Sequence, residues 1–273
     1  MKFSLEIFPP KITDGIEKIY GCLAGMSKVL PDFISVTYSA GDAKKGLTSE
    51  VCEYVQNTYG IHAVAHLTCA GHDKNSIRAS LEDFRSKGID SVLALRGDVT
   101  EDKKLTDYKH ATDLMKDIND FGGFTLYGAC YPEGHVESKN FDQDIDVLKM
   151  KHELGVTEFL SQLFLDNNDF LNMRDKATEK GITATFSAGI MPITSAKQIV
   201  RMVKLSGAKI PNKAAKMIAK YENDEGALYK AGLDYAVKQI RNLAKEGVDS
   251  VHLYTMNNIN TAAYVRIGIE DLL

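Results

Sequence analysis

Residues 62–97 read HAVAHLTCAGHDKNSIRASLEDFRSKGIDSVLALRG, and this stretch decides the fold class. It begins and ends with short apolar runs (62–68 and 91–97) that have the length and composition of buried parallel strands. Between them, the apolar residues of 76–88 recur at three- and four-residue spacing, which is typical of a helix lying on a sheet. The stretch therefore predicts a strand, a helix ending near Gly88, and a second strand parallel to the first.

The same unit recurs along the whole chain. Further strand-like runs occupy 2–8, 32–38, 124–131, 158–164, 183–190 and 250–256, and helical patterns occupy 16–30, 111–123 and 145–156. Glycines follow several of the helical segments, as expected where a helix ends and the next strand begins: Gly88, Gly122, Gly155, Gly181 and Gly247. Eight such units in 273 residues predict a (β/α)8 TIM barrel, with residues 1–273 forming a single domain. A doubly wound open sheet remains the alternative, because alternation of strands and helices does not by itself distinguish open from closed sheets.

One segment departs from this rhythm. Residues 193–248 are too many for a single helix between the seventh and eighth strands. Their pattern predicts three helices, with Pro211 opening the second and the charged stretch ENDEG (222–226) forming a solvated turn. We therefore expect extra helices at this place in the barrel.

Composition excludes several classes of protein. The formal net charge of −4 argues against a nucleic-acid-binding protein, and no run approaches the roughly 18 apolar residues that a membrane helix needs. The N-terminus lacks the apolar core of a signal peptide, and the four cysteines show no C-x-x-C spacing. These features predict a reduced, cytoplasmic protein without a membrane or nucleic-acid partner.

Common catalytic motifs are missing as well. The seven histidines include neither H-E-x-x-H nor His-x-His, so no metal site is expected. The sequence has no G-x-S-x-G elbow, no P-loop and no G-x-G-x-x-G fingerprint, and none of the expected strands carries a lysine in its interior for Schiff-base chemistry.

Polar residues stand where most of the expected strands end, and this is the edge at which TIM barrels carry their active sites. They include Thr37 and Tyr38, His66 and Thr68, Arg96 to Asp98, Tyr131 to His135, Gln162 and Asp166, and Tyr254 to Asn258. Glu6 is the sharpest signal, because strand alternation places it on the opposite face from Leu5 and Ile7. Burial disfavours a charged carboxylate, which suits a general acid. The alternative interpretation of Glu6 is a carboxylate paired with a lysine or arginine of the core.

At this point the sequence resembles a known family. The motifs FSLEIFPPK (3–11), SVTYSAG (35–41), HLTCAG (66–71), LALRGD (93–98), YPEGH (131–135), FLSQLFLD (159–166), GIMPIT (189–194) and HLYTMNN (252–258) occur in this order. Together they resemble methylenetetrahydrofolate reductase of the bacterial single-domain flavoprotein type. The resemblance covers the chain from residue 3 to the C-terminus.

The resemblance implies an enzyme of one-carbon metabolism that contributes to methionine biosynthesis. Such an enzyme binds FAD non-covalently, is often a homo-oligomer, and takes a hydride from NADH or NADPH in a ping-pong reaction. It passes the hydride through flavin N5 to methylenetetrahydrofolate, which becomes methyltetrahydrofolate. The use of one site by both substrates is consistent with the missing dinucleotide fingerprint, since the flavin carries the redox chemistry.

Carried onto this sequence, the resemblance implies that Glu6 is the general acid. Asp98 would tune the flavin and hold folate, Gln162 would hydrogen-bond the pterin or the nicotinamide amide, and Thr37 would lie near the nicotinamide nucleotide. The positions that match FAD contacts are Tyr38, Ala40, His66, Arg96, Gly97, Asp98, Ala111, Tyr131, His135, Asp144 and Lys151, with His110 adjacent to the adenosine contact.

Some positions depart from the family pattern of enterobacterial relatives. Ala196 stands where those relatives have Phe, Asn258 where they have Arg, and Val147 and Met150 where they have polar or basic FAD contacts. Without the Arg, recognition of a folate glutamate or a dinucleotide phosphate must come from elsewhere. These departures keep a second hypothesis open, namely a flavin- or folate-binding subunit of a larger complex that receives electrons from a protein partner.

Overall fold

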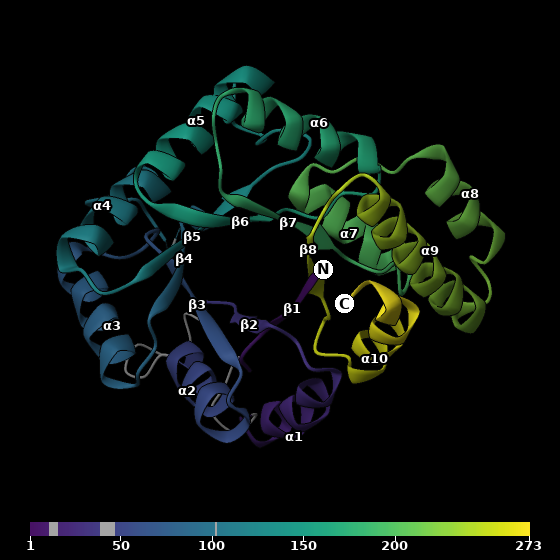
Figure 1. The fold of residues 1–273 in the computed structure, drawn as a ribbon, viewed down its shortest axis with the longest axis horizontal. Coiled ribbons are helices and arrows are strands. Elements are labelled where there is room, and N and C mark those ends of the chain that lie inside the picture. The colour runs from purple at the N-terminus through teal and green to yellow at the C-terminus, as the bar shows by residue number, and fades with distance from the viewer. Residues whose placement is uncertain (11–15, 39–46, 102) are drawn as a thin grey trace.

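The computed structural model describes residues 1–10, 16–38, 47–101 and 103–273. Its centre is a closed barrel of parallel strands in chain order, in which β8 pairs with β1 (Figure 1). The strands are β1 (Lys2–Ile7), β2 (Phe33–Val36), β3 (His62–Thr68), β4 (Ser91–Leu95), β5 (Thr125–Cys130), β6 (Val156–Ser161), β7 (Thr185–Ile190) and β8 (Ser250–Tyr254). The closed order confirms the predicted (β/α)8 barrel and excludes the open doubly wound sheet.

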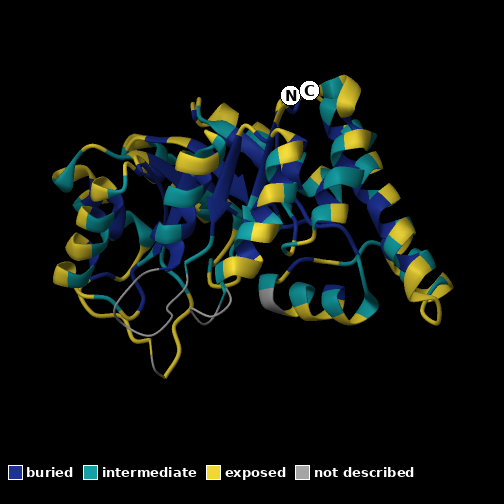
Figure 2. Cartoon of the chain, turned by 90° about the horizontal axis from the view of Figure 1, so that it is seen from below, coloured by how far each residue is buried: buried dark blue, intermediate teal, exposed yellow. Residues whose placement is uncertain are grey.

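Helices surround the barrel, and their exposed residues face outward while the strands are buried (Figure 2). They are α1 (Ile16–Met26), α2 (Leu47–Tyr59), α3 (Lys74–Ser86), α4 (Ala111–Phe121), α5 (Phe141–Glu153), α6 (Asn167–Glu179), α7 (Ala196–Ser206), α8 (Asn212–Lys220), α9 (Glu225–Lys245) and α10 (Ile259–Gly268). Two short 3₁₀ turns, η2 (Ser27–Val29) and η3 (Glu270–Leu272), follow α1 and α10. Gly88 and Gly247 leave α3 and α9 at φ 69° and 76°, as predicted for residues that follow a helix.

The segment between β7 and β8 contains the three predicted helices, α7, α8 and α9. Pro211 is the N-cap of α8 rather than its first helical residue. The predicted turn at 222–226 is shorter than expected, because Asp224 caps α9 by accepting from the Ala227 N–H and the helix begins at Glu225. The three helices between β7 and β8 pack on an apolar cluster separate from the main core. This cluster includes Met191, Ile193, Ile199 and Leu228.

Strand alternation divides the apolar residues between two cores. Leu5, Ile7 and Leu67 face outward and pack under the helices in the main core, where each is fully buried. Truncating such a side chain to alanine typically costs about 2–5 kcal/mol.

A smaller cluster fills the middle of the barrel interior: Phe33, Val64, Leu93, Tyr127 and Leu160. Because this cluster blocks the middle of the barrel, the two ends of the interior are separate environments.

The two ends of the chain are close together, since the Met1 amino group donates to the Leu272 carbonyl at 2.7 Å (Figure 1). No helix in the described ranges has both the length and the apolar composition required to cross a bilayer.

Candidate active site

A cavity of about 1000 Å³ opens at the C-terminal ends of the strands. Residues from all eight strands or from the loops after them line it, and α7 contributes one side. The predicted residues that it brings together are Glu6, Thr37, Tyr38, His66, Arg96, Gly97, Asp98, Tyr131, His135 and Gln162. Convergence at this rim is the placement that a TIM barrel predicts for an active site.

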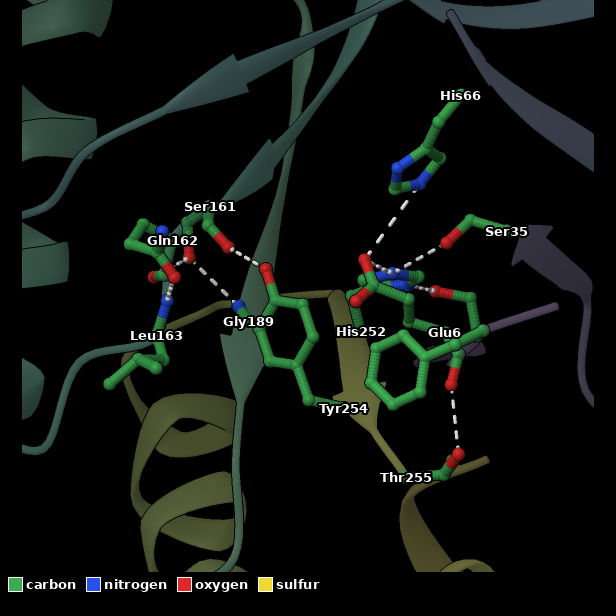
Figure 3. Close-up of polar contacts among 12 residues, drawn as sticks. Glu6, Ser35, His66, Ser161, Gln162, Leu163, Gly189, His252, Tyr254 and Thr255 are labelled. Carbon is green, nitrogen blue, oxygen red and sulfur yellow. Dashed lines mark hydrogen bonds and ion pairs between the residues drawn. The ribbon is translucent and has the colours of Figure 1, made fainter. Parts of the chain in front are cut away.

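Glu6 points into this cavity from β1, with its side chain 13% exposed. Its Oε2 lies 3.8 Å from His66 Nε2 and 3.9 Å from His252 Nε2 (Figure 3). No lysine or arginine of the described residues forms an ion pair with it, so the alternative of a carboxylate paired with a core cation does not apply to the described chain. The carboxyl group is therefore close to two imidazoles and open to the cavity.

His252 lies on β8 beside Glu6 and is completely buried. Its Nδ1 is 2.7 Å from the Ser4 hydroxyl, and its Nε2 is 3.1 Å from the Ser35 hydroxyl. Because Ser4 donates its own proton to the Val251 carbonyl, the Ser4 oxygen is left to accept from an Nδ1–H. This assigns the proton of a neutral His252 to Nδ1 and leaves Nε2 as the acceptor from Ser35.

His66 is the second imidazole at Glu6, and its Nε2 is buried without a hydrogen-bond partner among the described residues. Burial lowers the pKa of His66 to about 4, while the nearby Glu6 opposes this shift. At neutral pH the ring is uncharged, so Glu6 has no cationic imidazole on this side. A buried polar atom without a partner is costly, and a bound ligand that meets it would recover that cost.

Beside Glu6, Tyr254 belongs to a hydrogen-bonded layer formed by β6, β7 and β8. Tyr254 donates its hydroxyl to the Ser161 carbonyl at 2.6 Å, and the Ser161 hydroxyl accepts from the Gly189 N–H at 2.8 Å. A Cβ on Gly189 would lie 2.1 Å from the Ser161 carbonyl oxygen, so only glycine permits this approach. Burial raises the pKa of Tyr254, which keeps the hydroxyl proton that this bond requires.

Gln162 lies beside this layer and faces the cavity. Its Oε1 accepts from the Leu163 N–H at 2.8 Å, which fixes the orientation of the amide (Figure 3). The groups that remain for a ligand are chiefly its amide N–H donors.

A second cavity of about 350 Å³ lies between the ends of β4 and β5 and the helices α4 and α5. It shares Leu95, Arg96, Ala129, Tyr131 and His135 with the large cavity, so the two adjoin. The predicted residues that line it are Arg96, His110, Ala111, Tyr131, His135, Asp144 and Lys151. Of the predicted set, Ala40 lies outside the described residues.

Hydrogen bonds and ion pairs fix the positions of the charged side chains around the second cavity. The Arg96 guanidinium forms a two-point ion pair with Glu137, and Asp144 accepts from the His135 N–H and the Ser138 hydroxyl. Lys151 is buried and donates to the Ala129 carbonyl at 2.7 Å, and burial lowers the pKa of its ammonium to about 8. At neutral pH Lys151 therefore stays largely cationic and faces a space that an anionic ligand could enter.

The residues that depart from the family pattern take structural roles or face the cavities. Asn258 caps α10 by accepting from the Thr261 N–H, and Asn257 bridges the chain ends of β1 and β8 through both backbone groups of Phe8. Val147 and Met150 line the smaller cavity, and Ala196 begins α7.

The sequence interpretation missed several residues that the fold brings to the site. His252 stands two residues before Tyr254, so strand alternation could have placed both on the inward face. Lys197 and Arg201 of α7, and Lys103, also line the large cavity. These three lie away from the strand ends, so the search for polar residues where strands end could not find them.

Comparisons with known proteins agree with this geometry. The family model for methylenetetrahydrofolate reductase matches residues 1–267. The chain is similar to the 5,10-methylenetetrahydrofolate reductases of Pectobacterium carotovorum (30% identity, covering 93% of this chain and 85% of the relative) and Escherichia coli (29%, 93% and 86%). It is 32% identical to methylenetetrahydrofolate reductase (NADH) 1 of Arabidopsis thaliana, of which it spans about half (48%).

A solved structure is similar in fold. It is an uncharacterized protein from Clostridium thermocellum described as binding two copies of 5-methyl-5,6,7,8-tetrahydrofolic acid. The TM-score is 0.70 at 13% identity, and the match covers 99% of this chain and 95% of that one.

Proposed function

The chain belongs to the methylenetetrahydrofolate reductase family of oxidoreductases, and from this and the site we infer that it reduces 5,10-methylenetetrahydrofolate to 5-methyltetrahydrofolate. We propose FAD as its cofactor and NADH or NADPH as the hydride donor. The single observation that carries the proposal is Glu6, a carboxyl group open to a large cavity and flanked by two imidazoles.

The residues at the two adjoining cavities fit FAD. The buried Nε2 of His66 lacks a partner among the described residues, and the ammonium of Lys151 supplies positive charge for a phosphate group. The residues that would hold the cofactor are Tyr38, His66, Arg96, Gly97, Asp98, His110, Ala111, Tyr131, His135, Asp144 and Lys151. When bound, the flavin supplies the hydride transfer between the nicotinamide and the folate.

In this proposal Glu6 holds a proton and delivers it to N10 of the folate. Protonation there opens the five-membered ring of methylenetetrahydrofolate to the reactive iminium, which then accepts the hydride. The lack of a lysine or arginine partner among the described residues supports this role, because no ion pair there keeps the carboxyl group from the substrate.

The remaining polar residues bind and orient the substrates. The amide N–H groups of Gln162 donate to a pterin or nicotinamide carbonyl, since its oxygen is already engaged by Leu163. Asp98 lies exposed at the cavity and accepts from the folate ring, and Thr37 contributes to nicotinamide binding.

A second candidate function is a subunit of the same fold that takes electrons from a protein partner. The observation that favours it is the apolar lining that Val147 and Met150 give to the smaller cavity, with Met150 48% exposed. Native mass of the purified protein, alone and with candidate partners, distinguishes such a complex from a homo-oligomer.

An anaerobic visible spectrum tests the proposal. We expect a yellow protein whose flavin bleaches with NADH and recovers its colour with methylenetetrahydrofolate. Colour that NADH leaves unchanged would instead support electron delivery by a partner. A colourless protein that does not take up added FAD would contradict the flavoenzyme proposal.

A further inference from the structure

The large cavity has more positive than negative charge, although the whole chain carries a formal net charge of −4. The lysines and arginines that line it in the described chain are Arg96, Lys103, Lys197 and Arg201, and the acids are Glu6 and Asp98. Arg96 is already neutralised by Glu137. This charge distribution indicates that the cavity accepts an anionic ligand.

Two of these cations form a pair on α7. Lys197 and Arg201 are four residues apart, so they project from the same face of the helix. Both are exposed, and neither forms an ion pair with an acid among the described residues. Because no acid of the described chain neutralises them, their charge remains available to a ligand.

The fold holds this pair in place. Ile199 lies between the two cations in sequence. It is fully buried in the apolar cluster under α7, α8 and α9. The Ser195 hydroxyl caps the helix by accepting from the Gln198 N–H at 3.1 Å. Figure 1 shows α7 beside β7 and β8, on the opposite side of the barrel from α4. The cations therefore lie on the side of the cavity away from the smaller one.

We propose that Lys197 and Arg201 form a subsite for the carboxylates of the folate glutamate tail. This inference rests on the proposed function, because it requires the reacting folate ring to lie near Glu6. The tail then leaves the base of the cavity past β7 and meets the pair on α7. A guanidinium binds a carboxylate through two parallel hydrogen bonds, and an ammonium adds a point charge for the next carboxylate along the tail.

Dinucleotide phosphates are the competing ligand. Phosphates in proteins favour the free N–H groups of a helix N-terminus. In α7 the Gln198 N–H is already bonded to Ser195, so this terminus offers fewer donors to a phosphate. Two exposed cations on one face of a helix suit a chain of carboxylates better, and a chain with more glutamates makes more such contacts.

The test compares methylenetetrahydrofolate with one and with three glutamates, using FAD-loaded protein reduced by dithionite so that electron supply does not limit the result. We expect the wild type to show a KM for the triglutamate about tenfold lower than for the monoglutamate at low salt, with the preference shrinking as salt is added. The double variant Lys197→Ala/Arg201→Ala loses this preference, and the effect falls on KM and not on kcat. Lys204→Ala is the matched control, since Lys204 is exposed on the same helix and does not line the cavity.

Each other outcome has a defined meaning. A double variant that keeps the glutamate preference overturns the inference. So does one in which, in a second assay with NADH in place of dithionite, only the KM for NADH rises, because the pair then serves dinucleotide phosphates. A wild type that reduces neither folate although its flavin is reduced overturns the proposed function itself.

Discussion

The barrel interior contains two glutamates at opposite ends, and their surroundings differ sharply. At the N-terminal end, Glu158 of β6 is 4% exposed, accepts from the hydroxyls of Ser187 and Ser250, and lies 3.7 Å from the Lys2 ammonium. At the C-terminal end, Glu6 lies between two imidazoles and faces a cavity, and no hydroxyl donates to its carboxyl group among the described residues.

The two glutamates differ in their hydrogen-bond and ion-pair partners, and this difference separates a structural contact from an open site. Partners from β7, β8 and β1 satisfy the carboxyl group of Glu158, and these contacts tie β6 to the three other strands. Glu6 lacks such partners among the described residues, which leaves its carboxyl group open to a ligand in the cavity. In TIM barrels the N-terminal end serves stability and the C-terminal end serves chemistry, and the roles proposed for the two glutamates follow this division.

The largest expected effect comes from Glu6→Gln. The amide keeps the shape of the side chain but cannot deliver a proton, so we expect folate reduction to fall by about 10²–10⁴-fold. FAD binding and flavin bleaching by NADH should change little, because neither step needs that proton. Stopped-flow measurement of the two half-reactions checks this, and equal losses in both would remove Glu6 from the acid role.

His66 provides the next effect, on stability rather than rate. Burial lowers its pKa to about 4 from the ordinary 6.5. Between these pH values the unfolded chain binds a proton that the folded chain does not, so stability is present above pH 6.5 and decreases as pH falls toward 4. The loss amounts to about 3 kcal/mol at most. Urea unfolding across this range should show a weaker pH dependence for His66→Gln than for the wild type, and equal slopes would contradict the assignment.

Glu158→Gln should show the opposite profile to Glu6→Gln. It removes a buried charge from its hydroxyl and ammonium partners, and we expect a loss of about 1–3 kcal/mol in the free energy of unfolding. The rate of folate reduction by the folded enzyme should stay within about twofold, because the residue lies beyond the cluster that fills the barrel. A loss of rate without a loss of stability would break the division between the two ends.

The smallest effect is expected for Ser35→Ala. Removing the hydroxyl takes away the donor to His252 Nε2 and should cost about 1 kcal/mol of stability. Nε2 then lies 3.9 Å from Glu6 without another donor, so it competes for the Glu6 proton and folate reduction should decrease several-fold. Nitrogen-15 NMR of the imidazole should show the proton on Nδ1 in the wild type, and a proton on Nε2 would refute the assigned tautomer.

How far the sequence could predict this site depends on the position of each residue in its strand. Glu6, Gln162 and Arg96 were found because each stands in or just after a short apolar run, where alternation and strand ends can be read directly. His252 stands in the same kind of run, so the same alternation places it on the inward face with Tyr254. Its partners Ser4 and Ser35 come from strands far away in sequence, and only barrel closure brings them together.

The sequence by itself determined the strand and helix pattern, the three extra helices after β7 and the rim at which polar residues gather, because these follow from local periodicity. Its motifs also determined the family, which the comparisons show independently. Only the tertiary structure decided that Glu6 lies between two imidazoles while Glu158 lies among hydroxyls. It also decided that α7 turns toward the cavity two cations that no acid of the described chain pairs. The physical reason is that burial and charge environment depend on contacts between distant strands, which closure of the barrel creates and no local pattern encodes.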